Sequence, residues 1–120
     1  MEKIITKELG CLVNVSDLNG KMRNDWRESY CGEGLIVMFE ICGEDGEKHQ
    51  FIRFYINEPE SLVQRHVTTS AGSITEDDGT TWVFVTRNSL YTFARKHSMS
   101  KLEAEVLIIN VWRELGQIDI

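Results

Sequence analysis

Few side chains in this sequence have the types and spacing that a reaction or a metal ion requires. Cys31, Cys42, His49 and His66 could ligate a metal in principle, but no two of them have the close spacing of a zinc-ligand pair. Nucleophilic catalysis needs a serine or cysteine beside a base, and the sequence has no G-x-S-x-G motif, catalytic-cysteine signature or glycine-rich phosphate loop. We therefore expect no catalytic residue, no bound metal and no cofactor, in a protein that is not an enzyme.

One segment has the composition of a protein-binding surface. Trp26, Arg27 and Tyr30 lie close together in a polar stretch that also contains Asp25. Tryptophan, tyrosine and arginine are the residue types that dominate the binding energy of protein interfaces. The segment is therefore a candidate contact site, and the alternative is that Trp26 fills the edge of the hydrophobic core.

A second candidate surface is acidic. Two turn dipeptides, Asp45-Gly46 and Asp78-Gly79, are surrounded by carboxylates, which are Glu44, Asp45, Glu47, Glu76, Asp77 and Asp78. If the two turns lie side by side, their acids form one negative rim. Such a rim could enter a basic groove on a nucleic-acid-handling protein and compete there with phosphates. The alternative is that these charges only keep the turns solvated.

Size and composition restrict the classes of protein to consider. A chain of 120 residues with 42% hydrophobic residues is the size of one domain, which we expect to span residues 1–120. The net charge of −6 gives no overall basic surface, so binding to nucleic acid is not expected. Three cysteines without a CxxC pair, and no apolar run of about 20 residues, favour a cytoplasmic protein outside the membrane.

The first two thirds of the chain have the pattern of strands and tight turns. Apolar residues alternate with polar ones in residues 11–18, and residues 35–42 and 48–56 predict a hairpin around Asp45-Gly46. Both faces of residues 48–56 are largely apolar, so a helix should cover this strand on at least one side. Residues 80–86 predict another strand, with residues 66–74 as its partner, and residues 57–60 should begin a short helix over residues 61–66.

The last third predicts two helices joined by a tight corner. Leu90, Phe93 and Ala94 have helical spacing, and Ser100 with Glu103 matches the capping box that begins a second helix over residues 101–115. That second helix has two apolar faces. The wide face comprises Ala104, Leu107, Ile108, Val111, Trp112 and Leu115, and the narrow face comprises Leu102, Val106 and Ile109. The narrow face must be covered by the preceding helix, by the N-terminal segment or by another chain.

These elements together predict an α+β fold. We expect an antiparallel sheet of four to five strands with a C-terminal helical hairpin packed on one face. The structure of residues 1–32 is the least determined by their sequence pattern.

The corner of the expected hairpin resembles a helix-turn-helix motif. Ala94, the corner at Ser98-Met99 and Leu107 fall where that motif places small and apolar residues. The resemblance implies a recognition helix in the DNA major groove. However, Glu103 and Glu105 lie at the start of that helix, where they would repel phosphates.

We therefore expect a small acidic, non-enzymatic protein-binding module. The most specific form of this hypothesis is an inhibitor encoded by a phage or mobile element, which blocks a nucleic-acid-handling complex by charge mimicry. One alternative is a DNA-binding transcriptional regulator that uses Arg95, Lys96 and Lys101. Another is a homodimeric accessory subunit that pairs through the narrow helical face.

Overall fold

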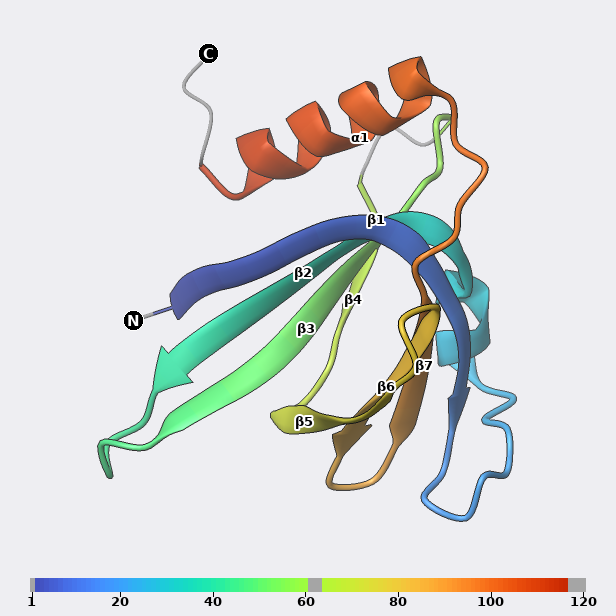
Figure 1. Cartoon of the computed structure of the whole chain (residues 1–120). Helices are drawn as coiled ribbons and strands as arrows, with labels where there is room; N and C mark the ends of the chain where they lie inside the picture. The colour runs from blue at the N-terminus through green and yellow to red at the C-terminus, as the bar shows by residue number, and fades with distance from the viewer. Residues whose placement is uncertain (1, 61–63, 117–120) are drawn as a thin grey trace.

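The computed structural model describes residues 2–60 and 64–116, and the chain is mostly β-strand (Figure 1). The strands are β1 (Glu2–Ser16), β2 (Gly32–Cys42), β3 (Lys48–Ile56), β4 (His66–Thr68), β5 (Gly72–Asp77), β6 (Thr81–Thr86) and β7 (Leu90–Ala94). A short 3₁₀ helix, η1 (Trp26–Tyr30), lies between β1 and β2, and α1 (Lys101–Glu114) follows β7. None of the helices in these described ranges is long and apolar enough to cross a membrane.

Six of the strands close into an antiparallel barrel. Around the ring, β1 pairs with β2, β2 with β3, β3 with β5, β5 with β6, β6 with β7, and β7 returns to β1. The strands β3 and β5 are paired through one residue pair, Gln50 and Gly72. The short strand β4 lies beside β3. The prediction of a sheet of four to five strands with a helical hairpin is therefore wrong.

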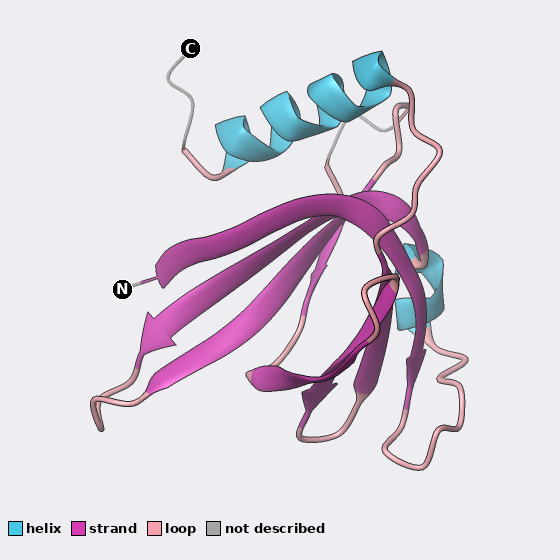
Figure 2. Cartoon of the chain, viewed as in Figure 1, coloured by secondary structure: helices cyan, strands magenta, loops and turns pink. Residues whose placement is uncertain are grey.

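The predicted first helix of the hairpin is the strand β7. Tyr91 and Phe93 point into the barrel while Leu90, Thr92 and Ala94 are only partly buried, so the period is two residues. Aromatic and β-branched residues favour this extended conformation. Residues 86–89, just before this strand, form a turn in which the backbone N–H of Thr86 donates to the carbonyl of Ser89. Figure 2 shows α1 as the single long helix of the described chain.

The long strand β1 joins the two ends of the ring by bending. Its first part pairs with β2 from Glu2 to Leu12, and its last part pairs with β7 from Cys11 to Ser16. Gly10 lies close to the point where β1 changes its pairing partner from β2 to β7. A Cβ atom at this position would collide with the carbonyl oxygen of Ala94. Glycines at such positions allow strands to bend and approach closely, as a small barrel requires.

The strands β2 and β3 bury side chains on both faces, which creates two hydrophobic layers. The barrel interior contains Leu12, Val15, Ile36, Met38, Ile52, Phe54, Ile56, Val67, Trp82, Phe84, Tyr91 and Phe93. The helix layer lies between α1 and the outer face of the sheet and contains Leu35, Val37, Phe39, Phe51, Tyr55, Met99, Leu107 and Val111. The prediction that residues 48–56 are apolar on both faces and covered by a helix is confirmed.

Other local predictions have mixed outcomes. The hairpin of residues 35–42 and 48–56 is confirmed as β2 and β3, and residues 80–86 contain β6. The strand predicted over residues 11–18 is the end of β1, which stops at Ser16. It begins at Glu2, nine residues before the predicted start. The predicted partner, residues 66–74, divides into β4 and the start of β5, and β5 pairs with β6. Of the helix predicted over residues 61–66, residues 61–63 lie outside the described part and His66 begins β4.

Candidate protein-binding surface

The 3₁₀ helix η1 is held in place by its own cap and by the barrel. Asp25 Oδ1 accepts the backbone N–H of Arg27 at 2.9 Å, and Asp25 Oδ2 lies 2.6 Å from a guanidinium nitrogen of Arg27. Tyr30 and Cys31, at the end of the helix, pack against the barrel interior. A short polar segment is thus fixed at both ends, which reduces the entropy that its side chains lose on binding a partner.

Four side chains at η1 form a continuous stack. The Arg27 guanidinium lies 4.6 Å from the centre of the Trp26 ring, and the Trp26 and Tyr30 rings meet edge to face at 6.0 Å. The Arg65 guanidinium lies 4.7 Å from the Tyr30 ring. We call Trp26, Arg27, Tyr30 and Arg65 the η1 stack. Trp26 remains 57% exposed, so the alternative that it fills the edge of the core is wrong.

Carboxylates balance the two arginines of the η1 stack. Asp25 binds Arg27, and Glu58 binds Arg65 through two short contacts of 2.6 and 2.8 Å. The hydrogen bonds from Arg65 lower the pKa of the Glu58 carboxyl, which keeps this pair ionised near neutral pH. The surface therefore presents an exposed indole beside two arginines that are each paired with a carboxylate.

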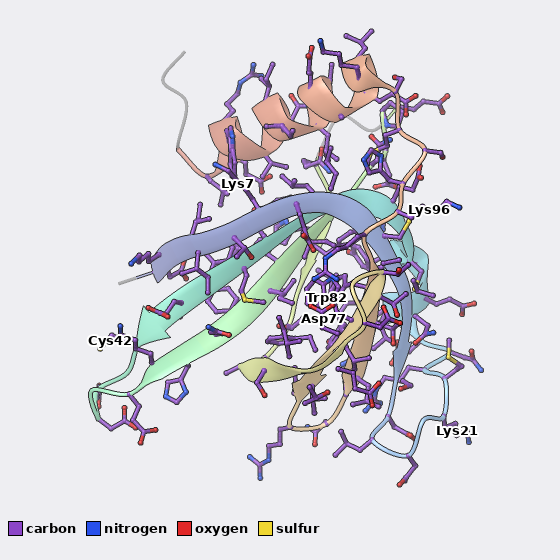
Figure 3. All side chains as sticks on the ribbon, viewed as in Figure 1. Lys7, Lys21, Cys42, Asp77, Trp82 and Lys96 are labelled. Carbon is purple, nitrogen blue, oxygen red and sulfur yellow. The ribbon has the colours of Figure 1, made fainter. Side chains whose placement is uncertain are left out.

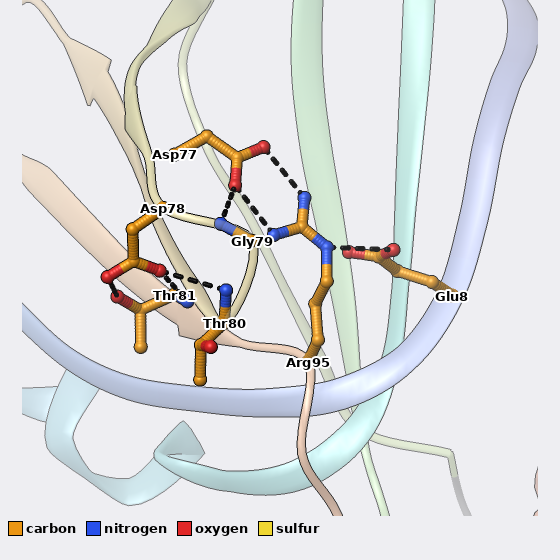
Figure 4. Close-up of polar contacts among 7 residues, drawn as sticks. All are labelled: Glu8, Asp77, Asp78, Gly79, Thr80, Thr81 and Arg95. Carbon is orange, nitrogen blue, oxygen red and sulfur yellow. Dashed lines mark hydrogen bonds and ion pairs between the residues drawn. The ribbon is translucent and has the colours of Figure 1, made fainter.

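Two acids of the β5–β6 turn, Asp77 and Asp78, accept hydrogen bonds from groups within the protein. Asp77 accepts two hydrogen bonds from the Arg95 guanidinium, at 2.8 and 2.9 Å, and Arg95 also lies 3.8 Å from a carboxylate oxygen of Glu8 (Figure 4). Asp78 accepts the backbone N–H groups of Thr80 and Thr81 at 2.8 and 2.7 Å. These hydrogen bonds lower the pKa of both carboxyls. Only Glu76 of this group is exposed without such contacts among the described residues.

The acidic turns do not form one rim. The tip between β2 and β3, with Glu44, Asp45 and Glu47, projects at one end of the sheet, whereas the β5–β6 turn lies against β1 and β7 (Figure 1). The reason is the path of β5, which pairs with β3 only at its first residue and then pairs with β6, so that its end lies near Arg95. Charge spacing along the sequence contains no information about this path.

The two predicted faces of α1 differ in burial, and among the described residues neither a preceding helix nor the N-terminal segment covers the narrow face. Ala104, Leu107 and Val111 are buried in or beside the helix layer. The narrow face is exposed, with Leu102 at 71%, Val106 at 46% and Ile109 at 43%. The predicted helix start is confirmed, because Ser100 Oγ accepts the backbone N–H of Glu103 at 3.1 Å. A groove lies beside this face, between α1 and residues 57–59 with Gln64.

The basic residues considered for DNA binding do not lie on a recognition motif. Residues 95–100 form an irregular link from β7 to α1, and Lys96 is on this link (Figure 3). Arg95 is engaged by Asp77 and Glu8. The helix-turn-helix interpretation is therefore wrong, since its first helix does not form.

Comparisons with protein families, with curated proteins and with solved structures found no match. The assignment of a site therefore depends on the geometry of this chain alone. Sequence reasoning found three members of the η1 stack but missed Arg65 and its partner Glu58. Arg65 is distant from Tyr30 in sequence, and no periodicity connects them.

Proposed function

We propose that this protein is a non-enzymatic binding module that recognises another protein through the η1 stack. The observation that carries the proposal is the 57% exposure of Trp26 within an ordered arginine and aromatic frame. A large exposed aromatic side chain supplies much binding energy when a partner removes it from water. Because Asp25 and Glu58 already neutralise the two arginines, the partner surface is expected to be largely apolar or aromatic rather than strongly charged.

Cytoplasmic localisation remains part of this proposal. The free cysteines Cys11, Cys31 and Cys42 would persist as thiols in a reducing compartment. Charge mimicry by one acidic rim is not part of it, because Asp77 is bound by Arg95, Asp78 accepts hydrogen bonds within its own turn, and the two acidic turns lie apart (Figure 1).

The test compares three versions of the full chain as bait in an extract of the organism that encodes it. The baits are the parent protein, Trp26→Ala, and a control, Leu102→Ala, which truncates a still more exposed apolar residue on α1. A specific partner should be retained by the parent and by the control and lost with Trp26→Ala. Its affinity for purified Trp26→Ala should fall at least about thirtyfold, because truncating an interface hot spot costs about 2 kcal/mol or more.

Two outcomes would contradict the proposal. One is a partner that binds Trp26→Ala as tightly as it binds the parent. The other is a partner that is lost with Leu102→Ala but retained by Trp26→Ala. That result would show that the partner binds α1 instead of the η1 stack.

A second candidate function is a homodimeric accessory subunit, and the exposure of Leu102, Val106 and Ile109 favours it. Stable interfaces bury about 800 Å² on each partner, which three side chains alone cannot supply. A dimer through α1 would therefore need further contacts around the helix. Sedimentation of the parent and of Val106→Ser at high concentration tests this, because a dimer through this face should dissociate in the variant.

A further inference from the structure

The tip of the β2–β3 hairpin brings together three metal-ligating side chains. Asp45, Glu47 and His49 each offer one donor atom, and these atoms lie within 4.8 Å of one another. All three side chains are exposed, so no barrier separates them from solvent ions. The prediction of no bound metal depended on the wide spacing of Cys31, Cys42, His49 and His66, and it left out the two turn acids Asp45 and Glu47.

Gly43 supplies an observation independent of the acids. Its φ is not positive, so the backbone conformation does not require glycine there. A Cβ atom at this position would lie 2.8 Å from Asp45 Oδ1 and 3.4 Å from His49 Nε2. The absence of a side chain at Gly43 therefore leaves the space in which a carboxylate oxygen and an imidazole nitrogen approach each other.

The hairpin holds the three ligands on a short ordered frame. The backbone N–H of Gly43 donates to the carbonyl of Glu47 at 2.7 Å, and the N–H of Gly46 donates to the carbonyl of Gly43 at 3.0 Å. Asp45 Oδ1 accepts the N–H of Glu47 at 2.9 Å, which leaves its second carboxylate oxygen free for an ion. Because these hydrogen bonds fix the turn before an ion arrives, the three side chains lose little conformational entropy when the ion binds.

The donor types select the class of ion. Imidazole suits zinc, copper, nickel and iron, whereas the all-oxygen sites preferred by calcium and magnesium have no histidine. Zinc ligands at about 2.1 Å from the ion are roughly 3.4 Å apart, so exposed side chains within 4.8 Å need only small rotations. We infer that Asp45, Glu47 and His49 bind a borderline divalent transition-metal ion such as Zn²⁺, with its remaining coordination positions open to water.

The first test is calorimetric titration of the full metal-free chain with ZnCl₂ in a reducing, non-chelating buffer. The parent should bind one ion at this site, and His49→Ala should weaken that binding by at least about tenfold, since even residues that only support a metal ligand change affinity by about 10–100-fold. His66→Ala is the matched control, because it removes another histidine near a carboxylate, Glu114. Cys42→Ser is the second control, because it removes the exposed thiol next to the hairpin tip. Both controls should retain the parent affinity.

The second test uses Gly43→Ala, which keeps every ligand and changes only the space between them. Zinc affinity should fall in this variant, while amide NMR spectra without metal confirm that the hairpin is still paired. In the parent, Zn²⁺ should shift the amide signals of residues 43–49. The inference is overturned if the parent binds no Zn²⁺, if His49→Ala binds as the parent does, if Gly43→Ala does not weaken binding, or if Cys42→Ser abolishes binding.

Discussion

The barrel interior and the helix layer share the strands β2 and β3 but are closed in different ways. Ile36, Ile52 and Phe54 point into the barrel, while Val37 and Tyr55, on the same strands, point toward α1. The interior is closed by a ring of paired strands. The helix layer is closed by one helix that follows an irregular link (Figure 1).

This difference has a thermodynamic consequence. Removing a side chain from the interior affects every strand of a closed ring, so the whole domain should lose stability together. The helix layer depends on α1 alone, and elements with one packed face can open locally while the rest stays folded. The following predictions test whether the two layers respond in these two ways.

The largest effect is expected in the barrel interior. Phe84 is fully buried, and Phe84→Ala should lower the free energy of unfolding by about 3–5 kcal/mol, because a large cavity remains. Urea unfolding followed by circular dichroism and by tryptophan fluorescence should give one coincident transition. A loss below about 1 kcal/mol, or two separated transitions, would contradict the description of the barrel as one cooperative unit.

A smaller loss is expected in the helix layer. Leu107 is 2% exposed, and Leu107→Ala should cost about 2–3 kcal/mol, at the low end for such truncations because α1 can shift toward the sheet. Hydrogen exchange should accelerate in α1 more than in β6 and β7. Equal acceleration in all of these elements would show that helix and barrel open together.

The helix cap should contribute still less. Ser100→Ala removes the oxygen that accepts the N–H of Glu103 and should cost about 1 kcal/mol. Ser73→Ala, at an exposed position of β5, is the matched control and should change stability by less than about 0.5 kcal/mol. An equal effect of the two substitutions in chemical unfolding would exclude a specific capping role for Ser100.

Acidification should weaken the helix layer through His66. Burial first, and then the Arg53 guanidinium, lower the pKa of His66 from its ordinary 6.5, although a Glu114 oxygen lies 3.7 Å from Nδ1. Just below pH 6.5 the unfolded chain binds more protons at this residue than the folded chain does. Stability therefore falls as the pH drops through this range.

The measurement is the free energy of unfolding at about pH 7.5 and about pH 5.5, above and below the ordinary histidine range. His66→Gln should lose less stability between these two conditions than the parent does. Every other residue is the same in the two proteins, so the difference between them reports on position 66. An identical pH dependence would contradict the shifted titration of His66.

The smallest effect is expected on the narrow face of α1. Leu102→Ser and Val106→Ser should each change the free energy of unfolding by less than about 0.5 kcal/mol, because both side chains are exposed. Leu107→Ala on the opposite face is the comparison. Loss of more than about 1 kcal/mol in dilute monomeric protein would mean that this face is covered within the chain.

Much of the local structure could be predicted from the sequence. The turn at Asp45-Gly46, the apolar faces of residues 48–56 and the cap at Ser100 depend on neighbours a few residues away. Trp26 and Tyr30 could be selected by residue type alone. Their stack with Arg65 could not, because that contact depends on where β3 and β4 bring the chain back.

Residues 88–97 show where local patterns are insufficient. Leu90, Phe93 and Ala94 fit a helical stripe, but Tyr91 and Phe93 equally fit a strand, and a segment this short does not separate the two periods. Its conformation is decided by two neighbours, β6 and β1, which supply hydrogen bonds along both edges.

From the sequence alone, the hairpin of β2 and β3, the strand β6, the start of α1 and the apolar faces of α1 could be predicted, because these depend on backbone preference and local spacing. Three features depend on contacts between distant segments: the strands close into a ring, Arg95 binds Asp77, and the two acidic turns lie apart (Figure 1). The physical reason is that closure depends on pairing between β1 and β7. These strands are distant in sequence, so no local pattern indicates that they pair.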